Sequence, residues 1–303
     1  MVLNLPPDFV RNIRQSFPPD SERWLTDLPN LLAGAARRWD LTLGEPFLLS
    51  YNYVCAATCA DGTPAVLKIG VPNPELTSEI NTLRVYDGQG ACRLLEADAE
   101  KGMLLLERLH PGMMLVTLTD DDHATEIAAQ VMQNIHRPTP QRDGFLSLGG
   151  WFDELKKLRP RFGGGTGPFP KKTFETAEAL IAELFAEDRP QVLLHGDFHH
   201  FNILSSDRGW LVIDPKGVIG PAEYEVGPLL TNPYNVMLKE TEAIRRTQRR
   251  IAILAEHLGF DCQRMRSWSF CHSVLSSFWD MAEDGSGGES ARIWAEIFII
   301  LKV

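Results

Sequence analysis

The order of strand-like and helix-like segments is the feature that most constrains the fold of this chain. Between Leu43 and Arg108 most segments alternate apolar with polar residues, as β-strands do. Beyond residue 110 apolar residues recur mainly every three or four positions, as on one face of a helix. This order predicts an α+β protein in which a short hinge joins a small β-rich lobe to a larger helical lobe. We place the division between residues 1–109 and 110–303, and we expect a cleft between the two lobes.

The β-rich lobe is predicted to contain three strands, one helix and two further strands. A helical segment over residues 7–39 precedes them, with Asp20 as its expected N-cap. Asp61-Gly62 is a strong hairpin signal between the second and third strands, and Asn73 followed by proline is typical of a capped helix start. The predicted strands are Phe47–Ser50, Tyr53–Cys59, Pro64–Ile69, Cys92–Ala97 and Met103–Arg108.

The second lobe is predicted to be helical except between residues 192 and 214. Thr119 is expected to cap a helix in which Ile127 recurs with further apolar residues at helical spacing. Within the exception, Val192–His195 and Trp210–Asp214 are short apolar segments on either side of a polar loop. We predict that they form a hairpin.

Composition excludes several classes of function. A formal net charge of -10 disfavours nucleic acid as a partner, because binding a phosphate backbone needs a basic surface, whereas a cationic small molecule is compatible with it. We find no secretory signal and no apolar run near the roughly 18 residues of a membrane span, so we expect a cytoplasmic protein with no membrane partner. Five scattered cysteines indicate a reducing compartment. Cys55 and Cys59 lack a second Cys or His pair nearby, so we expect no zinc site.

The segment from His195 to Asp214 carries the most informative chemistry. It reads His-Gly-Asp-Phe-His-His-Phe-Asn, with Asp197 and Asn202 five residues apart, and Asp214 follows on the next predicted strand. Phosphoryl transfer needs a carboxylate beside the attacking hydroxyl and oxygen ligands for Mg²⁺. We predict that Asp197 orients and deprotonates an alcohol, and that Asn202 and Asp214 hold the metal. His195 is expected to brace the loop.

The first lobe offers an independent test of a kinase hypothesis. A kinase fold places a lysine on the third strand and pairs it with a glutamate on the following helix. Lys68 meets the first condition, and Glu79 lies beside the helix face that is expected to pack on the sheet. Glu75, one turn earlier, is the rival partner.

These motifs resemble those of the aminoglycoside phosphotransferase family, relatives of protein kinases with an H-G-D-x-x-x-x-N loop and a metal-binding I-D motif. Pro215-Lys-Gly and the run from Gly220 to Asn232 are most similar to the branch of streptomycin 6-kinases and hydroxyurea kinases. The resemblance implies a bilobal protein-kinase-like fold that uses ATP and Mg²⁺. It also implies that the hinge backbone at Glu107 and Leu109 meets the adenine, and that Ser50 lies in a loop over the phosphates in place of a glycine-rich motif.

The acceptor is expected to be a small hydroxyl-bearing compound, with streptomycin-like aminoglycosides first and hydroxyurea next. Acidic residues of the helical lobe are candidates for binding a cationic acceptor, and Trp279 beside Asp280 offers an aromatic face together with an anion. The candidates are Glu223, Glu225, Trp279 and Asp280, with Glu283 and Asp284 close by.

Other functions remain open at this point. A kinase of an unrelated metabolite would use the same loop. A metal-dependent hydrolase would use His195, Asp197, His199 and His200 as a ligand cluster, but this hypothesis leaves Lys68 without a role. A non-catalytic nucleotide-binding protein is the third alternative.

Overall fold

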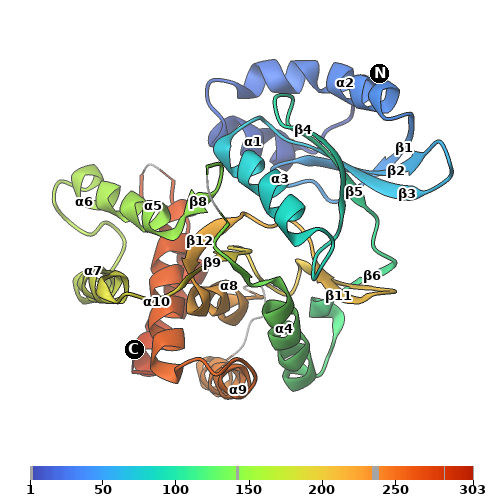
Figure 1. Cartoon of the computed structure of the whole chain (residues 1–303). Helices are drawn as coiled ribbons and strands as arrows, with labels where there is room; N and C mark the ends of the chain where they lie inside the picture. Colours follow the sequence, from blue (N-terminus) through green and yellow to red (C-terminus); the bar gives the residue numbers. More distant parts are fainter. Residues whose placement is uncertain (1–2, 141–142, 234–238, 283, 303) are drawn as a thin grey trace.

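The chain folds into two lobes, as shown by the computed structural model in Figure 1. A β-sheet with three helices forms the upper lobe in that view, and most of the remaining helices form the lower one. The structure describes residues 3–140, 143–233, 239–282 and 284–302. The predicted division at residue 109 stays a prediction, because one apolar core contains residues from both sides of it, including Leu106 and Phe198.

The upper lobe contains a five-stranded antiparallel sheet in the order β1-β2-β3-β5-β4. Side chains alternate between its two faces, so Leu67 of β3 packs toward α1 and α2 while Lys68 faces the opposite side, where α3 lies. The elements are α1 (Pro7–Ser16), α2 (Ser21–Arg38), β1 (Leu41–Pro46), β2 (Tyr53–Cys59), β3 (Pro64–Ile69), α3 (Pro74–Tyr86), β4 (Leu94–Asp98) and β5 (Met103–Glu107).

Two strand predictions in this lobe were shifted. The first strand is β1, not residues 47–50, because Leu41 to Leu43 pair with the end of β2. The apolar run that suggested the later position does not pack, since Leu48 is 99% exposed. The fourth strand begins at Leu94, not at Cys92. The Asn73 cap is confirmed, since its side chain accepts a hydrogen bond from the Leu76 N–H.

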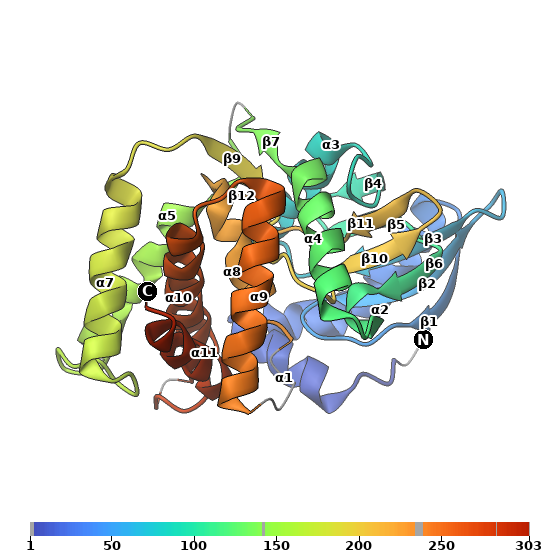
Figure 2. The ribbon, with the colours of Figure 1, turned by 90° about the horizontal axis from the view of Figure 1, so that it is seen from below.

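The lower lobe is built around α10, which contacts α7, α8 and α11. Figure 2 shows α4 and α9 side by side next to this group. Asp120, not Thr119, caps α4, because its carboxylate accepts from the His123 N–H. Asp20 precedes α2 but makes no side-chain cap. The helices are α4 (Asp121–Ile135), α5 (Leu148–Asp153), α6 (Leu158–Arg161), α7 (Lys171–Ala186), α8 (Val226–Thr231), α9 (Glu240–Leu258), α10 (Cys262–Trp279) and α11 (Glu289–Ile300).

The predicted hairpin between residues 192 and 214 is wrong in its pairing. β9 (Gln191–Leu194) pairs with β12 (Val218–Pro221), with β7 (Arg137–Pro138) and β8 (Leu146–Ser147) beside them. β11 (Gly209–Val212) pairs with β10 (Ile203–Ser206), which also contacts β6 (Pro111–Met114). The intervening residues therefore form a loop between two small sheets. Both Asn202, before β10, and Asp214, after β11, lie at one end of the β10–β11 hairpin, beside this loop.

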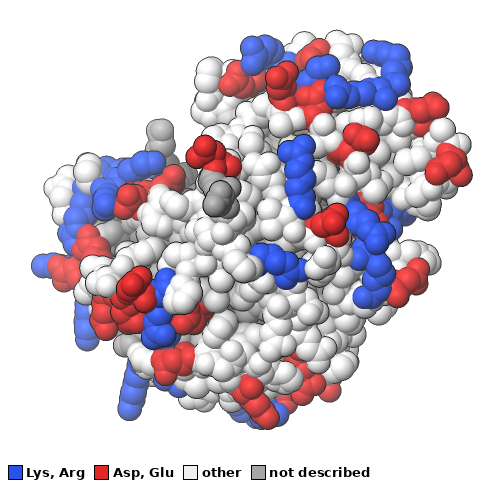
Figure 3. Space-filling view, viewed as in Figure 1, with Lys and Arg blue, Asp and Glu red and all other residues white. Residues whose placement is uncertain are grey.

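Three single-turn helices complete the description: η1 (Leu115–Thr117), η2 (Glu154–Lys157) and η3 (Ala222–Glu225). None of the helices in the described ranges is long and apolar enough to cross a membrane. On the face drawn in Figure 3, acidic and basic side chains are interspersed, and neither sign forms a continuous field. The net negative charge of the chain is therefore not gathered into one acidic surface on this face.

Candidate active site

The loop that carries Asp197 is held in place by the buried carboxylate of Glu225. Glu225 is fully buried and accepts hydrogen bonds from the backbone N–H groups of His195 (2.6 Å) and Gly196 (2.9 Å). The His195 ring accepts from the Asp197 N–H at Nδ1 and donates to the Ile213 carbonyl from Nε2. His195 therefore braces the loop as a neutral ring, in keeping with burial, which lowers its pKa.

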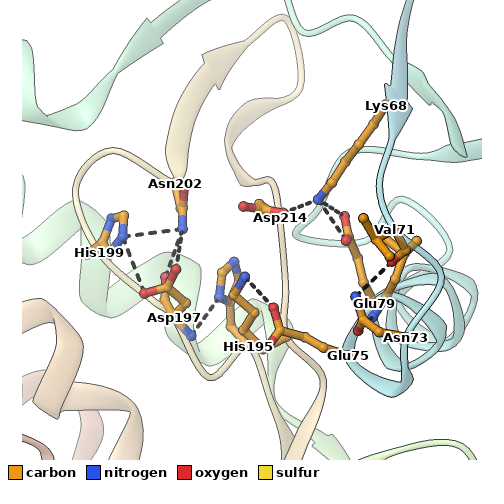
Figure 4. Close-up of polar contacts among 12 residues, drawn as sticks. Lys68, Val71, Asn73, Glu75, Glu79, His195, Asp197, His199, Asn202 and Asp214 are labelled. Atoms are coloured by element: carbon orange, nitrogen blue, oxygen red, sulfur yellow. Dashed lines mark hydrogen bonds and ion pairs between the residues drawn. The ribbon is translucent and has the colours of Figure 1, made fainter. Parts of the chain in front are cut away.

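The side chain of Asp197 is partly exposed. Its Oδ2 lies 3.4 Å from the Asn202 amide nitrogen, which also donates to the Asp197 carbonyl at 2.9 Å, and its Oδ1 lies 3.3 Å from His199 Nε2. Figure 4 shows these contacts. Burial alone would raise the pKa of Asp197, but the nearby His199 and Lys216 outweigh burial, and the pKa lies well below its usual value. Asp197 is therefore an ionised hydrogen-bond acceptor at neutral pH.

Lys68 joins the sheet of the upper lobe to the lower lobe. Its ammonium lies 2.7 Å from both carboxylate oxygens of Glu79 on α3, and it also contacts Asp214. The predicted partner Glu79 is therefore the one present, and Glu75 instead pairs with Lys216 at 2.8 Å. Burial would lower the pKa of Lys68, but the two carboxylates raise it overall, so Lys68 stays charged. These three contacts engage all three of its N–H donors.

Asp214 occupies a special backbone position after β11. Its φ is +60°, in the left-handed region that non-glycine residues rarely adopt, and aspartate tolerates it better than most residues do. This turn directs the carboxylate toward Lys68, while 36% of its side chain stays exposed. Burial would raise its pKa, but Lys68 and Lys216 lower it overall. Asp214 thus offers an ionised carboxylate at the open end of the site.

Asn202 and Asp214 fit the metal that sequence analysis assigned to them. The Asn202 amide nitrogen is committed to Asp197, which orients the amide and leaves its oxygen as an acceptor. An amide oxygen and an ionised carboxylate are the kinds of ligand that Mg²⁺ takes in proteins. The Lys68–Asp214 contact shows that this carboxylate already attracts a cation.

The chain matches a known family over most of its length. The family model described as "Aminoglycoside/hydroxyurea antibiotic resistance kinase" matches residues 42–285. This chain belongs to that kinase family. The resemblance predicted from the catalytic loop is therefore confirmed, and the protein is an ATP-dependent phosphotransferase.

Relatives of this kinase share about a third of its residues. Streptomycin 6-kinase of Streptomyces griseus is 30% identical over 286 residues, which cover 93% of this chain and 92% of the relative. Hydroxyurea phosphotransferase of Kitasatospora aureofaciens is 33% identical over 263 residues, which cover 85% and 74% respectively. Streptomycin 3''-kinase of Klebsiella pneumoniae is 29% identical over 265 residues, covering 84% and 94%.

Solved structures confirm the protein-kinase-like fold of this kinase. The choline kinase LicA of Streptococcus pneumoniae superposes with a TM-score of 0.65 at 14% identity, covering 91% of this chain and 99% of LicA. The aminoglycoside phosphotransferase APH(4)-Ia superposes with a TM-score of 0.60 at 15% identity, covering 92% and 99%. At these identities the likeness concerns the fold alone.

The hinge and loop residues assigned to the nucleotide lie apart from the charged cluster. The Glu107 carboxylate is engaged by Arg208 and by the Arg93 backbone N–H, so its side chain braces the hinge of the kinase. Leu109 is buried at the end of the hinge. Ser50 lies on the exposed loop between β1 and β2, where its carbonyl accepts from Asn12. Their roles toward ATP stay predictions.

The four predicted acceptor residues fall into two groups. Glu225 is buried beneath the catalytic loop, and Glu223 pairs with Arg264 at 3.3 Å, so both carboxylates have partners within the protein. Trp279 and Asp280 are exposed at the end of α10. Glu225 is thus placed to support the loop and not to touch an acceptor. Glu283 lies outside the described residues, and Asp284 bonds to Ser286.

Sequence reasoning gave no role to several residues of this site. Lys216 and Gly217 follow Asp214, and the Gly217 carbonyl accepts from Ser78 on α3 at 2.6 Å. A side chain at position 217 would collide with α3, because a Cβ there would lie 2.0 Å from the Thr82 hydroxyl. Trp151 of α5 borders the loop, 3.0 Å from where a Cβ on Gly196 would lie. The Pro-Lys-Gly run signalled Lys216 and Gly217, but no local pattern marked Trp151.

Proposed function

We propose that this kinase transfers the γ-phosphoryl group of ATP to a hydroxyl group of a streptomycin-type aminoglycoside. The observation that carries the proposal is the arrangement of five residues around the catalytic loop, here called the phosphoryl-transfer cluster. It supplies an ionised acceptor for a hydroxyl proton, a buried cation held by a carboxylate, and oxygen ligands for a metal. Relatives named for streptomycin phosphorylation support the choice of acceptor. The cluster is Lys68, Glu79, Asp197, Asn202 and Asp214.

The reaction follows from the position of the Asp197 carboxylate. An acceptor hydroxyl donates its hydrogen bond to Asp197, which directs the oxygen lone pair at the γ-phosphorus of ATP. As the new O–P bond forms, the bond from phosphorus to the β-γ bridging oxygen breaks and ADP leaves. The hydroxyl proton passes to Asp197 late, once the developing bond has acidified it. Asp197 acts mainly by orientation, because its lowered pKa makes it a weak base.

Lys68 is proposed to contact the phosphates of ATP. Its three donors are engaged by Glu79 and Asp214, so a phosphate oxygen has to replace one of these contacts. Glu79 is buried and binds through both oxygens, which makes Asp214 the contact that gives way. Asn202 and Asp214 would hold Mg²⁺, which neutralises charge on the phosphates when bound. ATP as donor is supported by a solved complex of LicA with AMP, which has a TM-score of 0.62.

A cationic acceptor fits the partly exposed surface beside the catalytic loop, here called the acceptor wall. The Trp151 and Trp279 rings meet edge to face at 5.1 Å, and the Trp279 indole N–H donates to Glu154 at 3.2 Å. Aromatic faces and carboxylates both attract cations, more so when water is partly excluded. The wall consists of Trp151, Glu154, Trp279 and Asp280, and it carries the preference for a guanidino or amino sugar.

Hydroxyurea is the second candidate acceptor. The observation that favours it is the hydroxyurea phosphotransferase relative, which has the highest identity, 33%, among the relatives compared.

A hydrolase is not favoured, because no group of three or more His, Cys, Asp and Glu side chains in the described ranges is placed to hold a metal ion. All five cysteines are free, which supports our proposal of a cytoplasmic location, where ATP is supplied.

The test compares acceptors directly. Purified full-length protein is incubated with MgATP and either streptomycin, hydroxyurea or a small neutral alcohol, and ADP release is measured together with product mass. We expect ADP release with streptomycin and a product heavier by one phosphoryl group. ADP release only with a neutral alcohol would contradict the proposed acceptor, and no ADP release with any acceptor in an extended screen would contradict the kinase activity.

A further inference from the structure

A pocket lies in the lower lobe, apart from the phosphoryl-transfer cluster and from the acceptor wall. Its volume is 620 Å³, and residues of neither set line it. Five pieces of chain form its walls: residues 115–119 after β6, the first turn of α4, one face of α9, His200 of the catalytic loop and Pro233 after α8. α4 and α9 lie side by side in Figure 2 and pack against each other. The pocket therefore borders the catalytic loop from the side of these two helices.

Four arginines of α9 line this pocket, and two of them are neutralised. Arg250 binds Asp121 through both Nε (3.0 Å) and Nη2 (2.5 Å), and Arg249 binds Asp122 at 2.8 Å. The other two are Arg245 and Arg246, for which the described ranges contain no ion pair. The remaining carboxylate of the lining, Glu242, makes none with them either. Arg245 and Arg246 therefore make no direct ion pair within the described part of the chain, although Asp121 and Glu242 lie near enough to act on Arg246 electrostatically.

Buried donors without partners line the same pocket. The Nε and Nη2 atoms of Arg246 are buried and have no hydrogen-bond partner among the described residues. His200 is only 3% exposed, and neither of its ring nitrogens has a partner there. Buried polar groups are normally hydrogen-bonded, so a cluster of unmet donors at a cavity indicates that something else supplies the acceptors. One ring nitrogen of a neutral histidine is always a donor.

We propose that this pocket binds the phosphate group of a small phosphorylated molecule. The lining carries four arginines and three carboxylates, so it has a net positive charge. Arginine binds phosphate oxygens through paired N–H donors, and Arg245 and Arg246 make no ion pair with the described residues, so their donors can bind a phosphate group. His200 supplies a further N–H, and the volume leaves room for an organic body beyond the phosphate. A cationic aminoglycoside is repelled by the same charges. The ligand therefore differs in charge from the acceptor proposed above, and the site stands independently of that assignment.

The pocket is connected to the catalytic loop through the backbone. The His200 carbonyl accepts a hydrogen bond from the Val116 N–H at 3.2 Å, and His200 lies two positions before Asn202. A phosphate held by the His200 ring therefore contacts the segment that positions Asp197 and Asn202. Whatever binds here is placed to change how that segment is held.

The experiment measures phosphate binding to the full chain by calorimetry at constant ionic strength. Inorganic phosphate and glucose 6-phosphate are the probes, and uncharged glucose is the negative control. We expect both phosphates to bind and glucose not to bind. Equal affinity for the two probes would assign the site to the oxyanion alone, and at least tenfold tighter glucose 6-phosphate would assign it to an organic phosphate. Absence of binding by both would overturn the proposal.

Variants locate the site. Arg246→Gln is expected to weaken phosphate at least tenfold, and His200→Phe provides a second test if the first variant is poorly folded. Arg84→Gln is the matched control, because it removes the same charge from an exposed position on α3 and should leave binding unchanged. Lys68→Ala should also leave it unchanged. Wild-type affinity in both pocket variants, or binding lost in Lys68→Ala, would overturn the proposal, the latter by placing the phosphate at the nucleotide site.

Thermal unfolding can distinguish a ligand-binding role of Arg246 and His200 from a purely structural role. If Arg246 and His200 only hold the fold, their variants should unfold at lower temperature without any anion. We expect the midpoint of Arg246→Gln without phosphate to match or exceed that of the wild type, because the substitution removes an unpaired buried cation. Phosphate should then raise the midpoint of the wild type and not that of the variant. Equal phosphate-dependent increases in the two proteins would contradict the proposal.

Discussion

The phosphoryl-transfer cluster and the acceptor wall both adjoin the catalytic loop, but they are built in different ways. Every charged group of the cluster has a partner within it: Lys68 holds Glu79 and Asp214, and Asn202 holds Asp197. In the wall, Trp279 is 41% exposed and Asp280 makes no side-chain hydrogen bond or ion pair with the described residues.

This difference separates a preorganised site from an adaptable one. Groups that act on a fixed reaction are held by neighbours, because a misplacement of about 1 Å already costs much of the rate. A wall of aromatic rings and carboxylates with few partners leaves its geometry to the ligand. We therefore expect substitutions in the cluster to change turnover and substitutions in the wall to change acceptor affinity.

The largest effect is expected for Asp197→Asn. The amide keeps the size of the side chain but loses the acceptor for the hydroxyl proton, so kcat should fall about 10³-fold. Affinity for ATP should stay within about twofold, because Asp197 faces the acceptor. Steady-state kinetics with streptomycin and nucleotide titration check the two expectations. Turnover within tenfold of the wild type would remove Asp197 from the reaction.

Lys68→Ala and Glu79→Gln test whether the cluster acts as a unit. Lys68→Ala should lower kcat/KM for ATP about 10²-fold, because one donor to the phosphates is lost. Glu79→Gln should have a smaller effect in the same direction, since it releases a cation that remains present. The double variant should resemble Lys68→Ala alone. A double-mutant cycle from kcat/KM values gives the coupling, and additive effects would show that the two residues act separately.

Substitutions in the acceptor wall should raise KM for the acceptor and leave kcat nearly unchanged. Asp280→Asn should raise KM for streptomycin about fivefold at low ionic strength, as expected for one exposed ion pair. The effect should shrink in 0.5 M salt, because salt screens exposed charges. Asp188→Asn, exposed after α7, is the matched control. An unchanged KM in Asp280→Asn, or a fall in kcat alone, would place streptomycin elsewhere.

The predictability of the two regions from sequence follows from how each is built. Asp197 and Asn202 lie on one short loop, and Lys68 and Glu79 lie on neighbouring elements, so local spacing sufficed to pair them. The wall joins Trp151 of α5 to Trp279 of α10, residues far apart in sequence, and only the packing of the lower lobe brings them together. Glu225 was misassigned because its negative charge suggested a cationic ligand, whereas two backbone N–H groups bind it.

Strand pairing was missed for a related physical reason. The segments 192–195 and 210–214 are both short and apolar, and alternation does not specify which strand pairs with which. β12, read from sequence only as part of a motif, is the partner of β9. The shift of β1 has a local cause, because Phe47 and Leu48 form an apolar run that is exposed and not packed. Hydrophobicity predicted the elements, and long-range packing decided their order in the sheets.

The last prediction concerns stability and not activity, at the support beneath the acceptor wall. His272 of α10 is buried against Tyr224, whose hydroxyl lies 2.9 Å from Nδ1. Burial lowers the pKa of His272 to about 4. His272 in the unfolded state therefore takes up a proton near pH 6.5, whereas His272 in the folded state does so only near pH 4. The contribution of neutral His272 to the free energy of unfolding is fully present above pH 6.5 and is lost as the pH falls toward 4.

The lowered pKa of His272 predicts a loss of stability in acid that a variant without this histidine should show to a smaller extent. Between pH 7.5 and pH 5 the His272 contribution to the free energy of unfolding should fall by about 2 kcal/mol. His272→Asn cannot titrate there, so its stability should fall less over the same range, whatever its value at pH 7.5. Urea unfolding of both proteins at several pH values measures the difference in slope. His123→Asn is the matched control, because it makes the same substitution at an exposed position on α4. Parallel slopes for wild type and His272→Asn would contradict the prediction, because they would show that the pKa of His272 is the same in the folded and unfolded states.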